Sequence, residues 1–395
     1  MMMLLARRLS VPVACAALVH TSRPASMDVP PASSSSHRKA DGIGSDRAAP
    51  HFRVYSRNGE VTSLNEVVDA MAGANVALVG EAHDDPVAHQ LELYLLMRVH
   101  ARANEEGARK RVVLSLEQFE RDTQATLDEY LAGVVREQDL LMDTRPWGNY
   151  DTDYRPMVEY AKARGMRVVA ANAPRRYVTI AGSKGLPHLE SLHTAAKYLP
   201  PLPLPPVSVD YKAHFQWAHV DALADAQGMA EAAPPLDASS VAYAAAARNH
   251  QQHNDGGGCP YIGLNAQAES LLDPIILWDA TMAHAIYSEA DAASLVVHIC
   301  GSFHSEYSLG IAEFLRHYDS SSRAVPSGAK GDGASSDEPR RVDPLRMVVV
   351  TIYPEEHIDS FDPVRHQNAG DFVILTDAHL PRSHDANSHR HLQQQ

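Results

Sequence analysis

Two histidines that follow the same short pattern are the first candidates for chemistry in this chain. Gly80 leads to His83 in the first Gly-x-x-His, and Gly301 leads to His304 in the second. A run of β-branched and apolar residues precedes each glycine and predicts a buried strand. Ligands of open α/β sheets bind at the carboxyl ends of the strands, where glycine lets the backbone turn sharply. One such pattern arises by chance, but two copies placed in this way predict a shared crevice.

The carboxylates that accompany these histidines indicate two kinds of chemistry. Glu81 lies two positions before His83, and Glu117 ends the next apolar run of the chain. In a parallel sheet these groups converge with His304 on one edge. A histidine or glutamate there can act as a general base beside an acid. Alternatively, His83, His304 and Glu117 can hold a divalent metal ion through nitrogen and oxygen, and the sequence leaves both chemistries open.

A second group of residue types suits a planar macrocycle. Trp147, Tyr150 and Tyr154 supply flat apolar surface and phenol oxygens, and Arg175 and Arg176 supply guanidinium donors. Haem needs this mixture, because it has apolar faces, an iron that takes an axial His or Tyr, and propionates that pair with arginine. On residue types alone, however, the aromatic rings are expected to cap the core and the arginines to lie in solvent.

The elements that must position these residues alternate between strands and helices. Strands are predicted at residues 76–79, 112–116, 167–171, 295–300, 345–353 and 371–375. Helices are predicted at residues 64–71, 86–104, 122–132, 154–164, 265–288 and 309–318, with a small hairpin at 52–62 ahead of them. Ser63 is the expected N-cap of the first helix, and Asp84 and Asp85 are expected to complement the N-terminus of the second. This order predicts an α/β fold with a mainly parallel central sheet flanked by helices.

Composition along the chain predicts how this fold is divided. Residues 51–181 and 259–380 are expected to form the α/β core, and residues 182–258 a helical insertion over the ligand edge of the sheet. Residues 28–50, residues 319–341 and the polar tail 381–395 are rich in Ser, Gly, Gln or His and are predicted to be disordered. Pro274 should kink or break the helix predicted at 265–288.

Residues 1–27 have the composition of a targeting segment. They contain arginines and no acidic residue before Asp28, which favours a mitochondrial transit peptide over a secretory signal. The net charge of −14 argues against a general nucleic-acid-binding protein, which needs a surplus of Lys and Arg. Three cysteines are too few for a disulfide framework. No later run reaches the roughly 18 apolar residues of a transmembrane segment.

Several motifs spread over about residues 70–318 together resemble one known group of proteins. They are Gly80-Glu-Ala-His83, Leu116-Glu-Gln-Phe-Glu-Arg-Asp-Thr-Gln124, Trp147 with Tyr154, Ala171-Asn-Ala-Pro174, Gln267 with Trp278-Asp-Ala-Thr-Met-Ala283, and Gly301-Ser-Phe-His304. In order and number they are similar to the motifs of the ChaN-like haem-binding proteins of the Tiki superfamily, which also includes TraB proteins and erythromycin esterases. The resemblance implies an α/β core with a helical subdomain.

For ChaN itself, the resemblance implies haem bound between two protomers in iron acquisition. It therefore leads us to expect haem or another small molecule as the ligand, and a homodimer that encloses it. Tyr150 or Tyr154 would then bind the iron, and Arg175 or Arg176 the propionates. The inserted segments and an N-terminus without a convincing lipoprotein cysteine depart from the bacterial pattern and put the uptake role in doubt more than the fold.

The same resemblance also implies an alternative, because other branches of the superfamily are hydrolases. The positions that those branches use, some with a divalent metal, correspond to Glu81, His83, Glu117 and His304. In that interpretation His83 or Glu81 acts as the base on a water molecule, and His304 and Glu117 orient the reactants or bind the metal. Haem binding is the function favoured at this point, and hydrolysis is its alternative.

Overall fold

The computed structural model of the chain describes residues 50–105, 110–192, 195–216, 218, 268–324 and 343–383. The expected targeting segment 1–27 and nearly all of the expected linker lie outside these residues. So do the expected insertion beyond residue 218, most of the loop expected at 319–341, Gln267, and the tail from residue 384 on. The mitochondrial or secretory location therefore stays a prediction.

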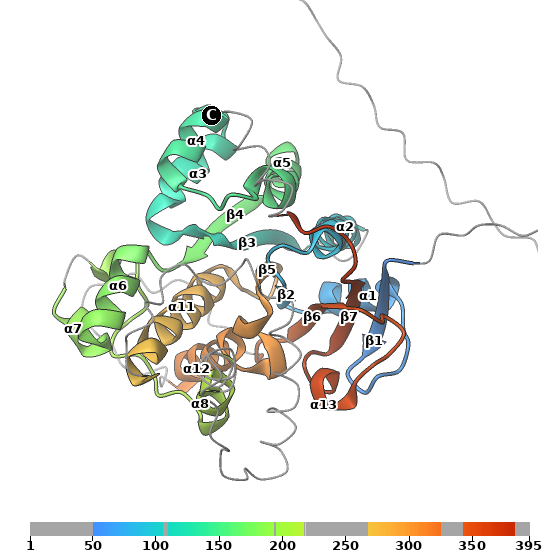
Figure 1. Cartoon of the computed structure of the whole chain (residues 1–395). Coiled ribbons are helices and arrows are strands. Elements are labelled where there is room, and N and C mark those ends of the chain that lie inside the picture. The colour runs from blue at the N-terminus through green and yellow to red at the C-terminus, as the bar shows by residue number, and fades with distance from the viewer. Residues whose placement is uncertain are drawn as a thin grey trace, which may run out of the picture. The chain divides into compact units, whose positions relative to one another are not determined.

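A seven-stranded sheet forms the centre of the described chain, in the order β1-β7-β6-β2-β5-β3-β4 (Figure 1). The strands are β1 (Phe52–Ser56), β2 (Val76–Glu81), β3 (Arg111–Glu120), β4 (Arg167–Asn172), β5 (Ser294–Gly301), β6 (Met347–Glu355) and β7 (Phe372–Asp377). Only the pairing of β1 with β7 is antiparallel; the other five pairings are parallel. The prediction of an α/β fold with a mainly parallel sheet is confirmed.

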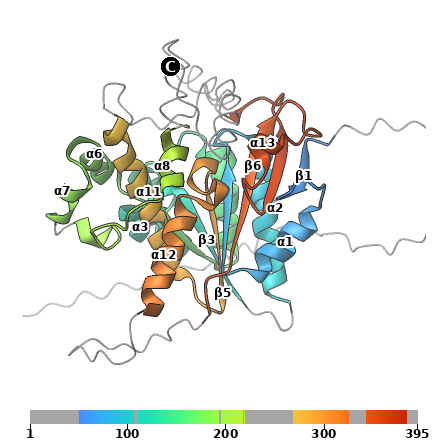
Figure 2. The same cartoon turned by 90° about the horizontal axis from the view of Figure 1, so that it is seen from below.

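Helices cover both faces of this sheet. They are α1 (Leu64–Gly73), α2 (Pro86–Ala103), α3 (Gln124–Leu131), α4 (Glu137–Thr144), α5 (Arg155–Ala163), α6 (Arg175–Lys184), α7 (Leu186–Glu190), α8 (Val209–Phe215), α11 (Ala268–Glu289), α12 (Ile311–Ala324) and α13 (Pro363–His366). One hydrophobic core joins α1 to α5 to one face, and a second joins α6, α7, α8, α11 and α12 to the other. Figure 2 shows α1 and α2 on the opposite side of the strands from α11 and α12.

Local sequence explains where the first helices begin. The side chain of Ser63 accepts a hydrogen bond from the backbone N–H of Glu66 and so caps α1, as predicted. At the start of α2, Asp85 accepts from the N–H groups of Val87 and Ala88, with Pro86 in the first turn. All residues of β2 and β5 are buried, as expected for strands covered by helices on both faces.

The order of the strands places the two histidine motifs side by side. β5 lies between β2 and β3, so the first two strands of the core are not neighbours, although a single strand-helix-strand unit was expected there. In the register of β2 with β5, Glu81 lies opposite Gly301. The ends of the two Gly-x-x-His strands therefore share one point on the carboxyl edge of the sheet.

Several elements differ from those predicted from the sequence. α4 and α6 were not predicted; α4, for example, buries only Leu140 and Thr144, so its apolar periodicity is weak. α12 continues to Ala324, beyond the predicted end at residue 318 and into the range expected to be a loop. α11 contains Pro274 within its span. β1 meets Val61 through one isolated bridge, and its main partner is β7 rather than a hairpin strand.

The described part of the expected insertion packs on the α11 side of the sheet. It contains the end of α6, α7, a 3-10 turn (Ala195–Lys197), a proline-rich segment and α8. Tyr211 of α8 is fully buried and reaches Asp279 of α11, which lies beside the second histidine motif. None of the helices in the described ranges has the length and hydropathy of a membrane span.

Candidate functional site

The two Gly-x-x-His motifs meet at Gly301. β5 ends at this glycine, and a 3-10 turn (Ser302–His304) then carries His304. A Cβ atom placed on Gly301 would lie 2.9 Å from Nε2 of His83 and 3.7 Å from Cδ2 of His304. The absence of a side chain at this position therefore leaves room for both imidazoles, which lie next to the same glycine.

A buried carboxylate orients the first histidine. Glu81 accepts hydrogen bonds through Oε1 from Nδ1 of His83 (3.0 Å) and from the hydroxyl of Tyr154 (2.6 Å). Because Nδ1 of His83 donates to this carboxylate, Nε2 is the nitrogen left to act as a base or a ligand. The side chain of His83 is 23% exposed, whereas that of Glu81 is fully buried. His83 is thus partly exposed, and its Nε2 lies next to Gly301.

Opposing effects act on the pKa of His83. Burial disfavours the imidazolium, but the hydrogen bond with Glu81 and the charge of Glu117 outweigh burial and raise the pKa of His83 above its usual value. The neighbouring charge on His304 acts in the opposite direction and lowers the pKa of His83. A positive charge on His304 therefore favours the neutral, coordinating form of His83.

A second carboxylate holds the other histidine more tightly. Nδ1 of His304 donates to Oδ1 of Asp279 at 2.5 Å, and Asp279 in turn accepts from the hydroxyl of Tyr211. Nε2 of His304 lies 3.7 Å from Oε1 of Glu117, whose other oxygen accepts from the N–H of Gly301. Burial opposes ionisation, but the charges of Asp279 and Glu117 raise the pKa of His304 to about 9. His304 is therefore protonated at neutral pH.

Of the three predicted aromatic residues, Trp147 lies against the first histidine and Tyr154 lies against Trp147. The Trp147 ring contacts the His83 ring edge-on, with 4.6 Å between ring centroids, and it contacts Tyr154 at 5.8 Å. Tyr154 is completely buried, and burial together with the charge of Glu81 raises its pKa well above the usual value. Tyr150 lies apart from this group, buried in the core beside Phe119.

The two predicted arginines belong to a neighbouring cluster of ion pairs. Arg175 pairs with Glu120 through its guanidinium and its backbone N–H, and Arg176 pairs with Asp122. Arg145, which was not predicted, also lies 3.2 Å from Glu120 and 3.6 Å from Asp122. Each of these guanidinium side chains is between 39% and 45% exposed. Three guanidiniums and two carboxylates thus form one cluster of ion pairs here.

Sequence reasoning missed residues that lie on helices. Asp279 was part of the Trp278 motif in the predicted helix but was not predicted as a site residue, and neither were His89 and Glu92. A signal was present for the last two, since a His and a Glu three positions apart on a helix lie on one face. Which face points to the sheet depends on packing, and both side chains are fully buried beneath Glu81.

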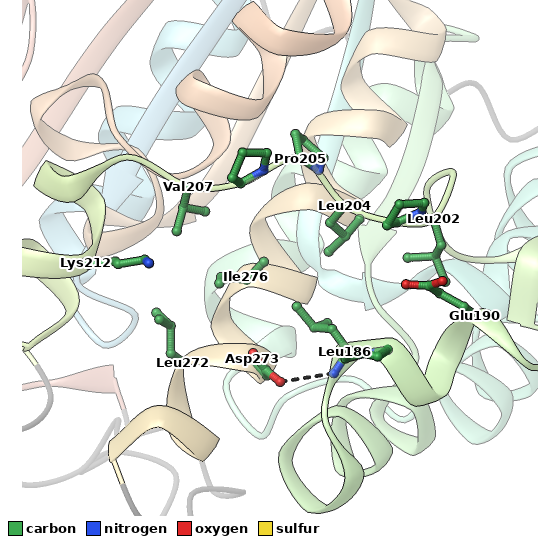
Figure 3. A pocket seen from close by; sticks show the side chains of 13 residues that line it. Leu186, Glu190, Leu202, Leu204, Pro205, Val207, Lys212, Leu272, Asp273 and Ile276 are labelled. Atoms are coloured by element: carbon green, nitrogen blue, oxygen red, sulfur yellow. Dashed lines mark hydrogen bonds between the residues drawn. The ribbon is translucent and has the colours of Figure 1, made fainter.

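A separate cavity of about 370 Å³ lies between α7, the proline-rich segment and the start of α11 (Figure 3). Its lining is mainly leucine and proline, and Asp273 accepts a hydrogen bond there from the N–H of Leu186 (3.0 Å). The described residues that line it include no His, Tyr, Cys or Met, the side chains that bind haem iron. This cavity is therefore not the place to expect a haem iron.

Comparison with known proteins agrees with this architecture. A family model described as "Haem-binding uptake, Tiki superfamily, ChaN" matches residues 67–315. A search of curated proteins gives no match. Among solved structures, ChaN of Campylobacter jejuni, described as binding haem cofacially, is 13% identical with a TM-score of 0.50, and the match covers 82% of this chain and 97% of that one.

Two other solved structures are less similar. A protein from Bacillus cereus is 15% identical with a TM-score of 0.35, and the match covers 74% of this chain and 70% of that one. RRSP, a MARTX toxin effector domain from Vibrio vulnificus, is 14% identical with a TM-score of 0.26, and the match covers 62% of this chain and 33% of that one. At these identities, likeness to a solved structure supports the fold alone, and only the first structure is similar enough to do so.

Proposed function

The chain belongs to the ChaN family of haem-binding uptake proteins in the Tiki superfamily, and from that premise we propose that it binds haem at the carboxyl edge of its sheet, with His83 as the axial ligand. The observation that carries this proposal is the state of His83. Its Nδ1 donates to Glu81, and no described residue forms a hydrogen bond with its Nε2. A carboxylate on one imidazole nitrogen orients the other toward a metal.

The structure favours His83 over the tyrosines that the sequence suggested as axial ligands. A tyrosine binds iron as a phenolate, and Tyr154 has a raised pKa and donates its proton to Glu81. Tyr150 lies buried in the core, where a haem cannot approach it without displacing the chain around it. His83 needs no such change because its side chain is already partly exposed.

The surroundings of His83 fit the rest of a haem molecule. Trp147 offers an aromatic ring edge-on to His83, and the partly exposed guanidiniums of Arg145, Arg175 and Arg176 are side chains of the kind that pairs with propionates. When bound, haem supplies an iron with open coordination positions. We also propose that a second copy of the chain covers the ligand, because a haem held by a partly exposed histidine leaves one face open to water.

An optical titration of the full chain with haemin tests this proposal. The wild-type chain should give a saturable Soret change near one haem per chain. His83→Ala should weaken binding by at least about 10-fold and shift the Soret band, since the apolar and propionate contacts remain. The matched control is His357→Ala, which removes an exposed histidine on the loop after β6 and should change neither. Equal binding by His83→Ala and the control would exclude His83 as the ligand.

A second candidate function is hydrolysis, and the Asp279–His304 pair favours it. Haem binding at His83 does not require a second histidine that is charged up to a pKa of about 9. With His83 as the general base on a water molecule, protonated His304 could stabilise developing negative charge or donate a proton. A screen of ester and peptide substrates tests this alternative. Turnover that His304→Ala abolishes, with haem binding unchanged, would support the enzyme.

A further inference from the structure

A second group of ligand-type side chains lies behind Glu81, on the far side from His83. It consists of Glu81, His89 and Glu92, whose ligand atoms all lie within 4.8 Å of one another. All three residues are buried, and the two carboxylate side chains are completely so. Glu81 therefore contacts both groups: Oε1 accepts hydrogen bonds from His83 and Tyr154, and Oε2 faces His89.

The distances within this group match those of ligands around a metal ion. Nδ1 of His89 lies 3.0 Å from Oε2 of Glu81 and 3.1 Å from Oε2 of Glu92. An imidazole nitrogen and a carboxylate oxygen that each lie about 2.1 Å from zinc are roughly 3.0 to 3.4 Å apart, depending on the angle between them. The third pair of ligand atoms, one oxygen each of Glu81 and Glu92, lies within 4.8 Å.

The other nitrogen of His89 fixes which form of the ring is present. Nε2 of His89 lies 3.1 Å from the carbonyl oxygen of His83, and a carbonyl only accepts, so Nε2 carries the proton. In a neutral ring, Nδ1 then presents a lone pair to two carboxylate oxygens. Such a contact is repulsive unless a positive charge lies between the three atoms. The arrangement requires either a proton or a metal ion at this point.

A divalent ion would balance the buried charge of this group, and the alternative balance is a proton on His89 together with a proton on Glu92, whose pKa burial raises well above its usual value. Glu81 and Glu92 bring two carboxylates into the interior, and Oε1 of Glu92 accepts no hydrogen bond from the described residues. Uncompensated buried carboxylates are costly, and one imidazolium neutralises only one of the two. A divalent cation neutralises both. The carboxylate of Glu92 could also bind such an ion through both oxygens, which would give Oε1 of Glu92 a partner.

One member of the group, His89, lines a cavity. A cavity of about 310 Å³ is lined by residues at the start of α2, by residues 152 to 156 and by residues 381 to 383. His89 and Asp153 both line it, and Oδ2 of Asp153 lies 3.3 Å from Nε2 of His89. The cavity therefore comes close to the site at His89, whereas Glu81 and Glu92 do not line it.

We propose that Glu81, His89 and Glu92 form a binding site for a divalent transition-metal ion of the zinc type, separate from the His83 and His304 crevice. One imidazole and two carboxylates suit such an ion, whereas magnesium and calcium prefer oxygen ligands alone. The site does not depend on the proposed haem function. Its structural consequence is that the ion holds the carboxylate that orients His83.

Zinc binding to the full-length chain tests the site. The chain has 22 histidines, so weakly bound ions are first removed by dialysis against a moderate chelator, and the retained zinc is counted per chain. The wild-type chain should retain one ion. Glu92→Gln, which keeps the shape of the side chain, should weaken zinc binding by at least about 100-fold. His304→Ala is the matched control, because it removes a ligand-type residue of the crevice and should retain the ion.

Each outcome decides the question. No retained ion in the wild-type chain would overturn the proposal and leave protons as the balancing charge. Zinc that is lost from His304→Ala and kept by Glu92→Gln would also overturn it, and would place the metal in the crevice instead. If Glu92→Gln does not fold, anomalous scattering from zinc-soaked crystals of the wild-type chain locates the ion directly. A peak between Glu81, His89 and Glu92 supports the site, and a peak elsewhere or none contradicts it.

Discussion

The two Gly-x-x-His motifs have the same sequence pattern but different surroundings. His83, two residues after β2, is 23% exposed, and its Nε2 has no hydrogen-bond partner among the described residues, whereas His304 after β5 is 11% exposed and lies between Asp279 and Glu117. The first histidine thus has a carboxylate beside one ring nitrogen, whereas the second has a carboxylate beside each. The comparison shows that a repeated motif fixes where a side chain lies, while the residues packed around it fix what it can do.

The largest expected effect concerns the carboxylates behind the two histidines. Glu81→Ala leaves His83, His89 and the hydroxyl of Tyr154 without their common partner, so it should destabilise the fold by about 3–5 kcal/mol. Asp279→Ala removes the partner of only His304 and Tyr211 and should cost less. Urea unfolding of both variants measures the difference. A larger loss of unfolding free energy in Asp279→Ala than in Glu81→Ala would contradict this expectation, because the second motif would then depend more on its carboxylate.

The next effect is on the pH dependence of stability. The folded-state pKa of His304, about 9, lies above the unfolded value of about 6.5. His304 therefore contributes its stabilisation fully below about pH 6.5 and loses it as the pH rises through about 9. Asp279→Asn should lower the pKa of His304 and remove up to about 2 kcal/mol of this pH dependence.

Unfolding free energies of the wild-type chain and Asp279→Asn between pH 6 and about 10 measure this effect. The two curves should diverge at low pH and converge at high pH. His83→Ala is the control from the first motif, and it should leave the slope near pH 9 in place. Parallel curves for the wild-type chain and Asp279→Asn would show that His304 is not the charged member of the pair.

The last effect separates the two glycines. A Cβ on Gly80 would lie 2.8 Å from the backbone Cα of Ser302, which cannot move freely, so Gly80→Ala should cost about 1–3 kcal/mol. A Cβ on Gly301 would instead meet the His83 ring at 2.9 Å. The side chain can rotate away, so Gly301→Ala should cost less stability but weaken haem binding. Thermal unfolding and haemin titration of both variants test this order. A larger stability loss in Gly301→Ala than in Gly80→Ala would contradict it.

Much of the fold could be predicted from the sequence because its strands are buried on both faces. The apolar runs ending at Gly80 and Gly301, and the turn chemistry at Ser63, are local signals that tertiary structure did not override. The position of β5 between β2 and β3 could not be predicted, since it depends on pairing between strands far apart in the chain.

The site could be predicted only where its residues follow a strand. Glu81, His83, Glu117 and His304 stand at or just beyond strand ends, where topology alone brings them together. Asp279, His89 and Glu92 lie on helices, and their contribution depends on which helix face packs against the sheet. The burial of Tyr154 could not be predicted either, because the local sequence of a tyrosine next to an expected loop does not show whether its side chain is buried.

The measurement that tests the central claim most directly is chemical rescue of His83→Gly by imidazole. The variant should bind haemin weakly and with an altered Soret band, because the axial nitrogen is lost while Trp147 and the arginine cluster remain. Added imidazole can occupy the vacated space beside Gly301 and should restore the wild-type spectrum and affinity. A variant that binds haemin as the wild-type chain does, or one whose spectrum imidazole leaves unchanged, would contradict His83 as the ligand.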